Sequence, residues 1–167
     1  MQETDRPILE DPEQFRRVWQ RVQGGRQEAA LASEGEPAPA SRPWDPVPFL
    51  QDALVQCRLR GAVCQQWNRL SPLGQVYQGQ ARRLTAALFL LRGIRPLSGR
   101  GMQPPRWPSL EESCRQLFFW ERRGETSYQT ALGQTADPDL RGLFQDLARE
   151  SAALQQRIRI ILEEQMG

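Results

Sequence analysis

The 167-residue sequence contains no histidine and no lysine, so all 22 of its basic side chains are arginines. The lack of histidine removes the commonest general base and the commonest ligand of transition metals. Acidic residues are also scarce in the middle of the chain, where residues 46–108 contain nine arginines and a single acid, Asp52. These absences exclude Ser-His and Cys-His catalysis and any metal centre that needs imidazole ligands.

Long apolar runs are missing as well, and none approaches the roughly 20 residues that a membrane-spanning helix needs. The start of the chain, MQETDRPILE, is acidic and polar, which is not typical of a secretion signal. The three cysteines form an odd set without C-x-x-C spacing, which favours free, buried thiols over disulfides or a zinc site. The sequence therefore predicts a cytoplasmic protein that contacts no membrane.

The charges that are present fall into three blocks with different signs. Residues 1–45 carry −3, residues 46–108 carry +8 and residues 109–167 carry −3, which together give the net charge of +2. The basic middle is expected to attract the acidic end, within one fold or between subunits. The nine arginines also allow a nucleic-acid-binding surface as an alternative, but no aromatic platform or recognised motif accompanies them, so nucleic acid is not the expected partner.

The first 45 residues predict a helical arm followed by a linker. DPEQFRRVWQRV begins at Asp11 with an N-cap residue and a proline at the first helical position, and its apolar residues lie on one face. Residues 26–45 are rich in Ala, Glu, Ser and Pro, as linkers often are. We therefore divide the chain into an arm and linker, 1–45, and a main domain, 46–167.

Helical periodicity predicts four long helices in the main domain, at about 46–70, 73–94, 109–132 and 138–166, and no strand. Asp45, Ser109 and Asp137 are the expected N-caps. The first and last connections are short and should join antiparallel neighbours. The middle connection, residues 95–108, contains four prolines and can extend over roughly 46–50 Å, longer than a helix of roughly 33 Å. This pattern predicts an all-α four-helix bundle with one long crossover of the ferritin-like kind, and an irregular loop in an up-and-down bundle is the alternative.

Residues 120–158, WERRGETSYQTALGQTADPDLRGLFQDLARESAALQQRI, resemble the second half of rubrerythrin-type proteins of the ferritin-like superfamily. That family pattern has a Glu seven residues before a Tyr, as in Glu121 and Tyr128, and then a D-P-x-L-R loop, as in DPDLR. It continues with L-F-x-x-I-A-x-x-E-x-x-H, whose beginning matches LFQDLA. The segment QARRLTAALFLLRG, residues 80–93, is similar to the first half of the family, and the resemblance covers roughly residues 46–165.

The resemblance implies a bundle in which the di-iron ligands of the family are replaced. The Glu and His positions of the last helix hold Ser151 and Leu154, or Glu150 and Ala153 if the register slips by one. In the first half, the Glu-x-x-His positions hold Tyr77 and Gln80, and the remaining Glu position holds Cys57 or, in another register, Arg60, with the apolar periodicity favouring Cys57. The degenerate ligand positions are therefore Cys57, Arg60, Tyr77, Gln80, Glu121, Ser151 and Leu154.

Only Glu121 keeps a ligand type, so we expect no metal and no other cofactor. Without histidine, and with Asp52 as the only acid of residues 46–108, the first two bundle helices cannot supply half of a carboxylate–histidine site in any register. Glu121 lies among apolar positions, and a buried carboxylate needs a partner or a proton. Tyr77, Gln80, Ser151 or Arg60 are its candidate partners, and a solvated Glu121 at the bundle edge is the alternative.

These observations predict a non-catalytic, metal-free bundle that serves as a structural or protein-interaction module. The expected partner is a second copy of the chain, in a homodimer formed through the arm or a bundle face. The resemblance implies a bacterial protein. The alternative is a cryptic enzyme or small-ligand binder that uses a polar layer around Glu121. An open pocket lined by Tyr77, Gln80, Glu121 and Ser151 would favour this alternative, and a closed layer would favour the non-catalytic function.

Overall fold

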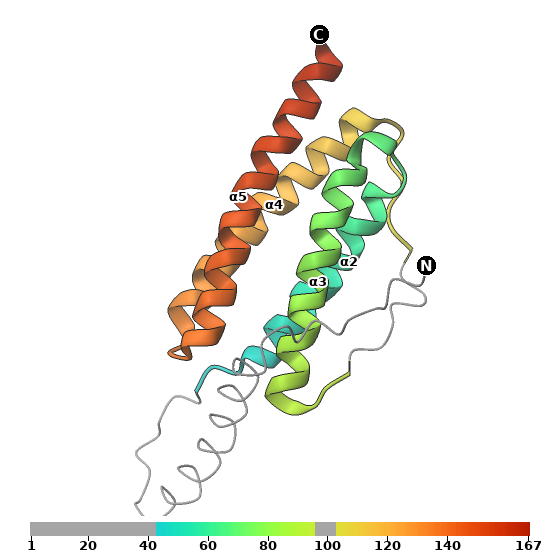
Figure 1. Cartoon of the computed structure of the whole chain (residues 1–167). Helices are drawn as coiled ribbons and strands as arrows, with labels where there is room; N and C mark the ends of the chain where they lie inside the picture. Colours follow the sequence, from blue (N-terminus) through green and yellow to red (C-terminus); the bar gives the residue numbers. More distant parts are fainter. Residues whose placement is uncertain (1–42, 96–102) are drawn as a thin grey trace, which may run out of the picture. The chain divides into compact units, whose positions relative to one another are not determined.

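The structure, a computed structural model, describes residues 43–95 and 103–167, and its helices are shown in Figure 1. Residues 44–167 form one compact unit. The described residues contain no strand, and this confirms the all-α prediction. The predicted helical arm and most of the linker lie outside the described residues. The elements are α2 (Pro46–Cys64), the 3-10 turn η1 (Asn68–Leu70), α3 (Ser71–Arg92), α4 (Leu110–Gln134) and α5 (Pro138–Met166).

Three of the four long helices begin at the predicted caps. The Asp45 carboxylate accepts a hydrogen bond from the Val47 amide, 3.1 Å away, and Ser109 Oγ accepts one from the Glu112 amide at the same distance. Asp137 accepts from the amides of Asp139 and Leu140. Each cap satisfies amides that the first helical turn leaves without a partner, so the local sequence fixes where these helices start.

The helix predicted to run to Leu70 ends earlier, at Cys64, and this boundary was wrong. Residues 65–67 form a turn, with Trp67 in an extended conformation, and η1 leads directly into α3. Tertiary contacts give the physical reason. The turn lets Trp67 Nε1 donate to Ser113 Oγ of α4 and places Leu70 in the apolar core.

The four helices form two antiparallel hairpins, α2 with α3 and α4 with α5 (Figure 1). The hairpins pack on each other through α2 against α4 and α3 against α5. Arg92 at the end of α3 forms an ion pair with Asp45 at the start of α2, whereas Trp67, after α2, donates to Ser113 at the start of α4. The connection from α3 to α4 therefore joins opposite ends of the bundle, and the predicted single crossover is confirmed.

The apolar core falls into two clusters, one near each end of the bundle. The first lies around Leu50, Leu84, Tyr128 and Phe144. The second lies around Leu70, Leu73, Leu117 and Ile158. Between the two clusters each helix contributes one buried polar residue: Arg60 from α2, Gln80 from α3, Glu121 from α4 and Ser151 from α5. A polar layer therefore divides the core at mid-height.

Aromatic residues outside the four predicted helices also contribute to the core. Trp44, in the segment predicted to be a linker, packs against Phe49 and Phe144, with ring centroids 5.9 and 6.1 Å apart. Trp107 meets Trp120 edge to face at 5.3 Å. These contacts fasten the segments before α2 and before α4 to the bundle.

The basic and acidic blocks of the sequence meet within this one chain. Arg83 of α3 pairs with Glu150 of α5, and Arg69 of η1 pairs with Glu164 near the end of α5. The expected attraction between the blocks is thus confirmed inside the fold. In the part of the chain that the structure describes, no helix combines the length and apolarity that crossing a membrane requires.

Candidate functional site

The polar layer lies on the inward faces of the four helices because helical spacing returns a side chain to the same face every three or four residues. Arg60 is three residues from both Cys57 and Val63, which are buried in the two apolar clusters. Glu121 lies between Leu117 and Tyr128 in the same way. The same helical periodicity that places the leucines in the core therefore also places these polar groups there.

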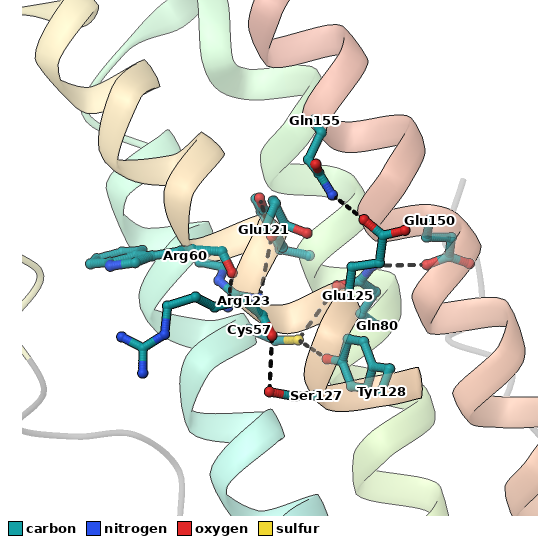
Figure 2. Close-up of polar contacts among 12 residues, drawn as sticks. Cys57, Arg60, Gln80, Glu121, Arg123, Glu125, Ser127, Tyr128, Glu150 and Gln155 are labelled. Atoms are coloured by element: carbon teal, nitrogen blue, oxygen red, sulfur yellow. Dashed lines mark hydrogen bonds and ion pairs between the residues drawn. The ribbon is translucent and has the colours of Figure 1, made fainter. Parts of the chain in front are cut away.

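Glu121 is the centre of the layer, with a fully buried side chain. Its Oε1 lies 3.3 Å from Arg60 Nη1 and accepts a hydrogen bond of 2.8 Å from the Tyr77 hydroxyl. Arg60, only 5% exposed, also donates from Nη2 to the main-chain oxygen of Trp120 at 3.1 Å. Three helices are thereby joined through one carboxylate, and Figure 2 shows the pair of Arg60 and Glu121 between α2 and α4.

The electrostatics of the pair follow from burial opposed by mutual attraction. Burial raises the pKa of Glu121 above its ordinary value, and Arg60, Tyr77 and Ser151 act in the opposite direction. Burial acts to lower the pKa of Arg60, but Glu121, Tyr77, Cys57 and Tyr128 together outweigh it and raise that pKa. Burial also raises the pKa of Tyr77, so its hydroxyl stays protonated and donates to the carboxylate.

A second group of contacts connects the layer with the surface on α3 and α5. The Cys57 thiol donates to Gln80 Oε1 at 3.4 Å and lies 3.9 Å from the Tyr128 hydroxyl. Gln80 Nε2 donates to Glu150 at 2.9 Å, and Glu150 also accepts from Arg83. Burial raises the pKa of the Cys57 thiol to about 11, which keeps this thiol protonated at neutral pH.

Three buried polar atoms of the layer have no hydrogen-bond partner among the described residues. They are Arg60 Nε, Glu121 Oε2 and Ser151 Oγ. Ser151 acts to lower the pKa of Glu121, although no hydrogen bond joins Ser151 Oγ to the carboxylate. The polar layer therefore contains buried donor and acceptor atoms that no described residue pairs with.

The structure brings most of the predicted site residues together. The prediction that Glu121 is buried and paired is confirmed, and its partners are Arg60 and Tyr77. Gln80, expected as a further partner, bonds to Cys57 and Glu150 instead, and Ser151 makes no hydrogen bond. Cys57 and Arg60, the two alternatives on the first bundle helix, are both buried, and Leu154 belongs to an apolar cluster.

Sequence reasoning missed two residues of the site, Gly124 and Glu150. A Cβ at Gly124 would lie 3.3 Å from both Arg60 Nη1 and Nη2, so the glycine makes room for the guanidinium. Its position three residues after Glu121 on the same helical face was the available signal. Glu150 appeared only in the slipped register, and its contacts with Gln80 and Arg83 come from the neighbouring helix α3.

The residues of the layer do not fit a metal ion. Among the described residues no group of three or more Cys, Asp or Glu side chains is placed to hold one. The position facing Glu121 is filled by the Arg60 guanidinium, which donates hydrogen bonds and carries its own positive charge. The chemistry of this donor set is that of an internal ion pair rather than of metal coordination.

No protein-family model matches the chain, and no curated protein and no solved structure shows significant similarity to it. The class of protein is therefore defined by fold and site alone. It is an all-helical bundle with a single crossover and a buried, ion-paired polar layer between two apolar clusters.

Proposed function

We propose that this protein is a metal-free member of the ferritin-like superfamily that acts as a structural or protein-interaction module rather than as an enzyme. The observation that supports it best is the ion pair of Arg60 and Glu121 at the bundle centre. A di-iron bundle of this kind places bound cations among buried carboxylates. Here a covalently attached cation lies beside the one remaining carboxylate, so the interior needs no metal to balance its charge.

The closed form of the layer also supports a non-catalytic function. Tyr77, Gln80, Glu121 and Ser151 are each at most 1% exposed. A substrate could not reach Glu121 without separating the helices that these residues join. A small-ligand site around Glu121 itself is accordingly not favoured.

The proposed interaction role draws on large apolar side chains that face solvent. Among the described residues, five are at least two-fifths exposed: Val55, Phe89, Phe119, Ile160 and Met166. Single exposed apolar residues are common in proteins. Here each of the four helices has at least one, so each could contact a partner. We propose that the protein self-associates through a bundle face or through the N-terminal arm.

Metal analysis tests the first part of the proposal. We expect the full chain, purified without added metal, to contain less than about 0.1 iron or manganese per chain, and addition of Fe²⁺ or Mn²⁺ to leave its melting temperature unchanged, because a bound ion stabilises the state that binds it. Inductively coupled plasma mass spectrometry and calorimetry measure both quantities. Stoichiometric metal, or a rise in melting temperature that depends on metal concentration, would refute the proposal.

Sedimentation velocity tests self-association. The full chain and a fragment of residues 44–167, the compact unit of the structure, are compared over a range of concentrations. A dimer in both samples assigns the contact to a bundle face, and a dimer in the full chain alone assigns it to the arm. Monomers in both samples at every concentration would rule out self-association.

A further inference from the structure

A groove between α2 and α4 lies beside the closed layer, shares Arg60 with it and has defined ends. At one end the Arg60 guanidinium bonds to the main-chain oxygen of Trp120, and at the other the rings of Phe49 and Tyr128 meet with centroids 6.0 Å apart. The cavity between them has a volume of about 390 Å³. This volume lies in the lower part of the range of about 300–1,000 Å³ typical of small-molecule sites, and it is too small for a docked helix.

The groove exists because small side chains face each other where the two hairpins meet. Ala53 of α2 lies opposite Gly124 and Ser127 of α4 among the lining residues. None of these three can fill the space between two helix axes. Because the α2–α4 contact is far less extensive than the contacts within either hairpin, the gap stays open between the two bridging ends.

Two cationic side chains line this cavity. The Arg60 guanidinium is already paired with Glu121, so Arg123 is the cation that remains for a ligand. Arg123 lies at the rim and extends away from the buried pair, 5.8 Å from the Phe119 ring (Figure 2). No carboxylate of the described residues pairs with Arg123. One acid, Asp52, lines the groove, and it belongs to the α2 turn next to Phe49 rather than to the turn that carries Arg60.

The remaining lining is suited to a flat apolar group. Phe49, Leu59, Trp120 and Tyr128 provide aromatic and aliphatic surface on both helices. Flat rings stack on such side chains, and guanidinium groups bind carboxylates and sulfonates through charge-assisted hydrogen bonds. The cavity thus combines positive charge at one end with apolar walls along its length.

We propose that the α2–α4 groove binds a small organic anion with an aromatic or other flat apolar body, whose acidic group lies near Arg123. The ligand body lies over Ala53, Gly124 and Ser127, between the rings of Trp120 and Phe49. This site does not depend on the ferritin-like relationship, because it rests only on the residues that line the groove. It therefore stands or falls separately from the proposed function.

Titration of the full chain with 1-naphthoate, and with neutral 1-naphthalenemethanol of similar size, tests the site. Calorimetry measures affinity, and two-dimensional NMR locates the perturbed amides. We expect 1-naphthoate to bind about tenfold more tightly than the alcohol, because one charge-assisted contact changes affinity by this order. The perturbed amides should include those of Ala53, Gly124 and Ser127.

Two variants and their matched controls make the test specific to the groove. Arg123→Gln should weaken 1-naphthoate about tenfold, whereas Arg122→Gln, which removes an exposed arginine outside the groove, should not. Ser127→Trp should fill the groove and abolish binding. Thr126→Trp is its control, because Thr126 is exposed, makes the same kind of hydrogen bond to the preceding turn and does not line the groove.

The proposal is overturned by any of three results. One is a lack of saturable 1-naphthoate binding to the unmodified chain. Another is undiminished binding in Ser127→Trp when circular dichroism shows an intact helical fold. The third is equal affinity for the acid and the alcohol, which would show that the positive charge of the groove does not contribute to binding.

Discussion

At the scale of single residues, Arg60 and Glu121 are the side chains on which the interior depends most. Moving two charges out of water costs several kcal/mol for each ion, and their mutual attraction offsets this cost only when both are present and well placed. Here two hydrogen bonds support the pair: the Tyr77 hydroxyl donates to Glu121, and Arg60 donates to the main-chain oxygen of Trp120. Removing one of the two side chains should therefore lower the free energy of unfolding far more than removing both.

Replacing Glu121 alone tests this dependence. Glu121→Gln leaves the Arg60 guanidinium buried without a counter-charge, and we expect the free energy of unfolding to fall by about 3–5 kcal/mol. Urea denaturation at neutral pH measures the change. The double variant Arg60→Met with Glu121→Leu should lose less stability than Glu121→Gln. Additive losses in the cycle formed with the corresponding single variants would contradict direct coupling between the two side chains.

The Cys57 thiol gives a second residue-level prediction, at alkaline pH. Burial raises its pKa from an ordinary value of 9.0 to about 11, so the folded chain holds this proton more tightly than the unfolded chain does. Stability from this group is therefore fully present below pH 9 and is lost as pH rises towards 11. The loss is of the order of 2 kcal/mol.

Urea denaturation of the unmodified chain and of Cys57→Ala, each at pH 8 and at pH 11, measures that contribution. The variant starts less stable because it lacks a buried sulfur, but its stability should fall less steeply between the two pH values. Cys64, whose pKa burial raises to about 12, is present in both proteins and cancels in the comparison. Parallel pH profiles would show that Cys57 does not ionise as described.

At the scale of elements, the glycines inside the helices differ in how close a neighbouring helix comes to them. Glycine weakens a helix by roughly 0.5–1 kcal/mol relative to alanine, so a glycine in mid-helix needs a compensating contact. Gly124 of α4 has one, because the Arg60 guanidinium lies against it, whereas a Cβ at Gly79 of α3 would meet nothing within 4 Å. The two glycines therefore have opposite expected effects when replaced.

Alanine at these two positions gives a matched pair of variants. Gly79→Ala should stabilise the protein by up to about 1 kcal/mol through helix propensity alone. Gly124→Ala should destabilise it by about 1–2 kcal/mol, because its methyl group displaces a guanidinium that is ion-paired and cannot move freely. Thermal and urea denaturation measure both effects. Equal stabilisation by the two substitutions would show that Arg60 moves aside without cost.

At the scale of the whole molecule, two hairpins are joined by a polar layer inside and by ion pairs outside. The pair of Arg83 and Glu150 is about one-third exposed at both side chains, and that of Arg69 and Glu164 is about half exposed. Such exposed pairs contribute little, typically below about 1 kcal/mol, and salt weakens them. The hairpins are therefore held together chiefly by their apolar clusters and by the buried pair.

Salt should separate the outer contacts from the inner one. Arg83→Gln should lower the free energy of unfolding by about 0.5–1 kcal/mol at low ionic strength, and this difference should shrink in about 1 M NaCl because exposed charges are screened. The larger loss in Glu121→Gln should persist at the same salt concentration, because its pair is buried. A salt-sensitive Glu121→Gln effect would place that pair in contact with solvent.

Much of the fold was predictable because it depends on local chemistry. Helix periodicity, the caps at Asp45, Ser109 and Asp137, and the length of the middle connection led to four helices and one crossover. The early end of α2 at Cys64 was missed, since the turn at residues 65–67 depends on contacts of Trp67 and Leu70 with residues far along the sequence. The packing of Trp44 against the bundle was also missed, because it depends on Phe144 far along the sequence.

The sequence by itself determined the composition of the interior, because apolar spacing assigns residues to helix faces and the lack of histidine removes a class of ligands. Only the tertiary structure decided which polar groups meet. Arg60, Tyr77 and Glu121 come from three different helices, and their pairing depends on the relative rotation and height of those helices. The groove between α2 and α4 was decided in the same way, since small residues leave a cavity only when two helices bring them face to face.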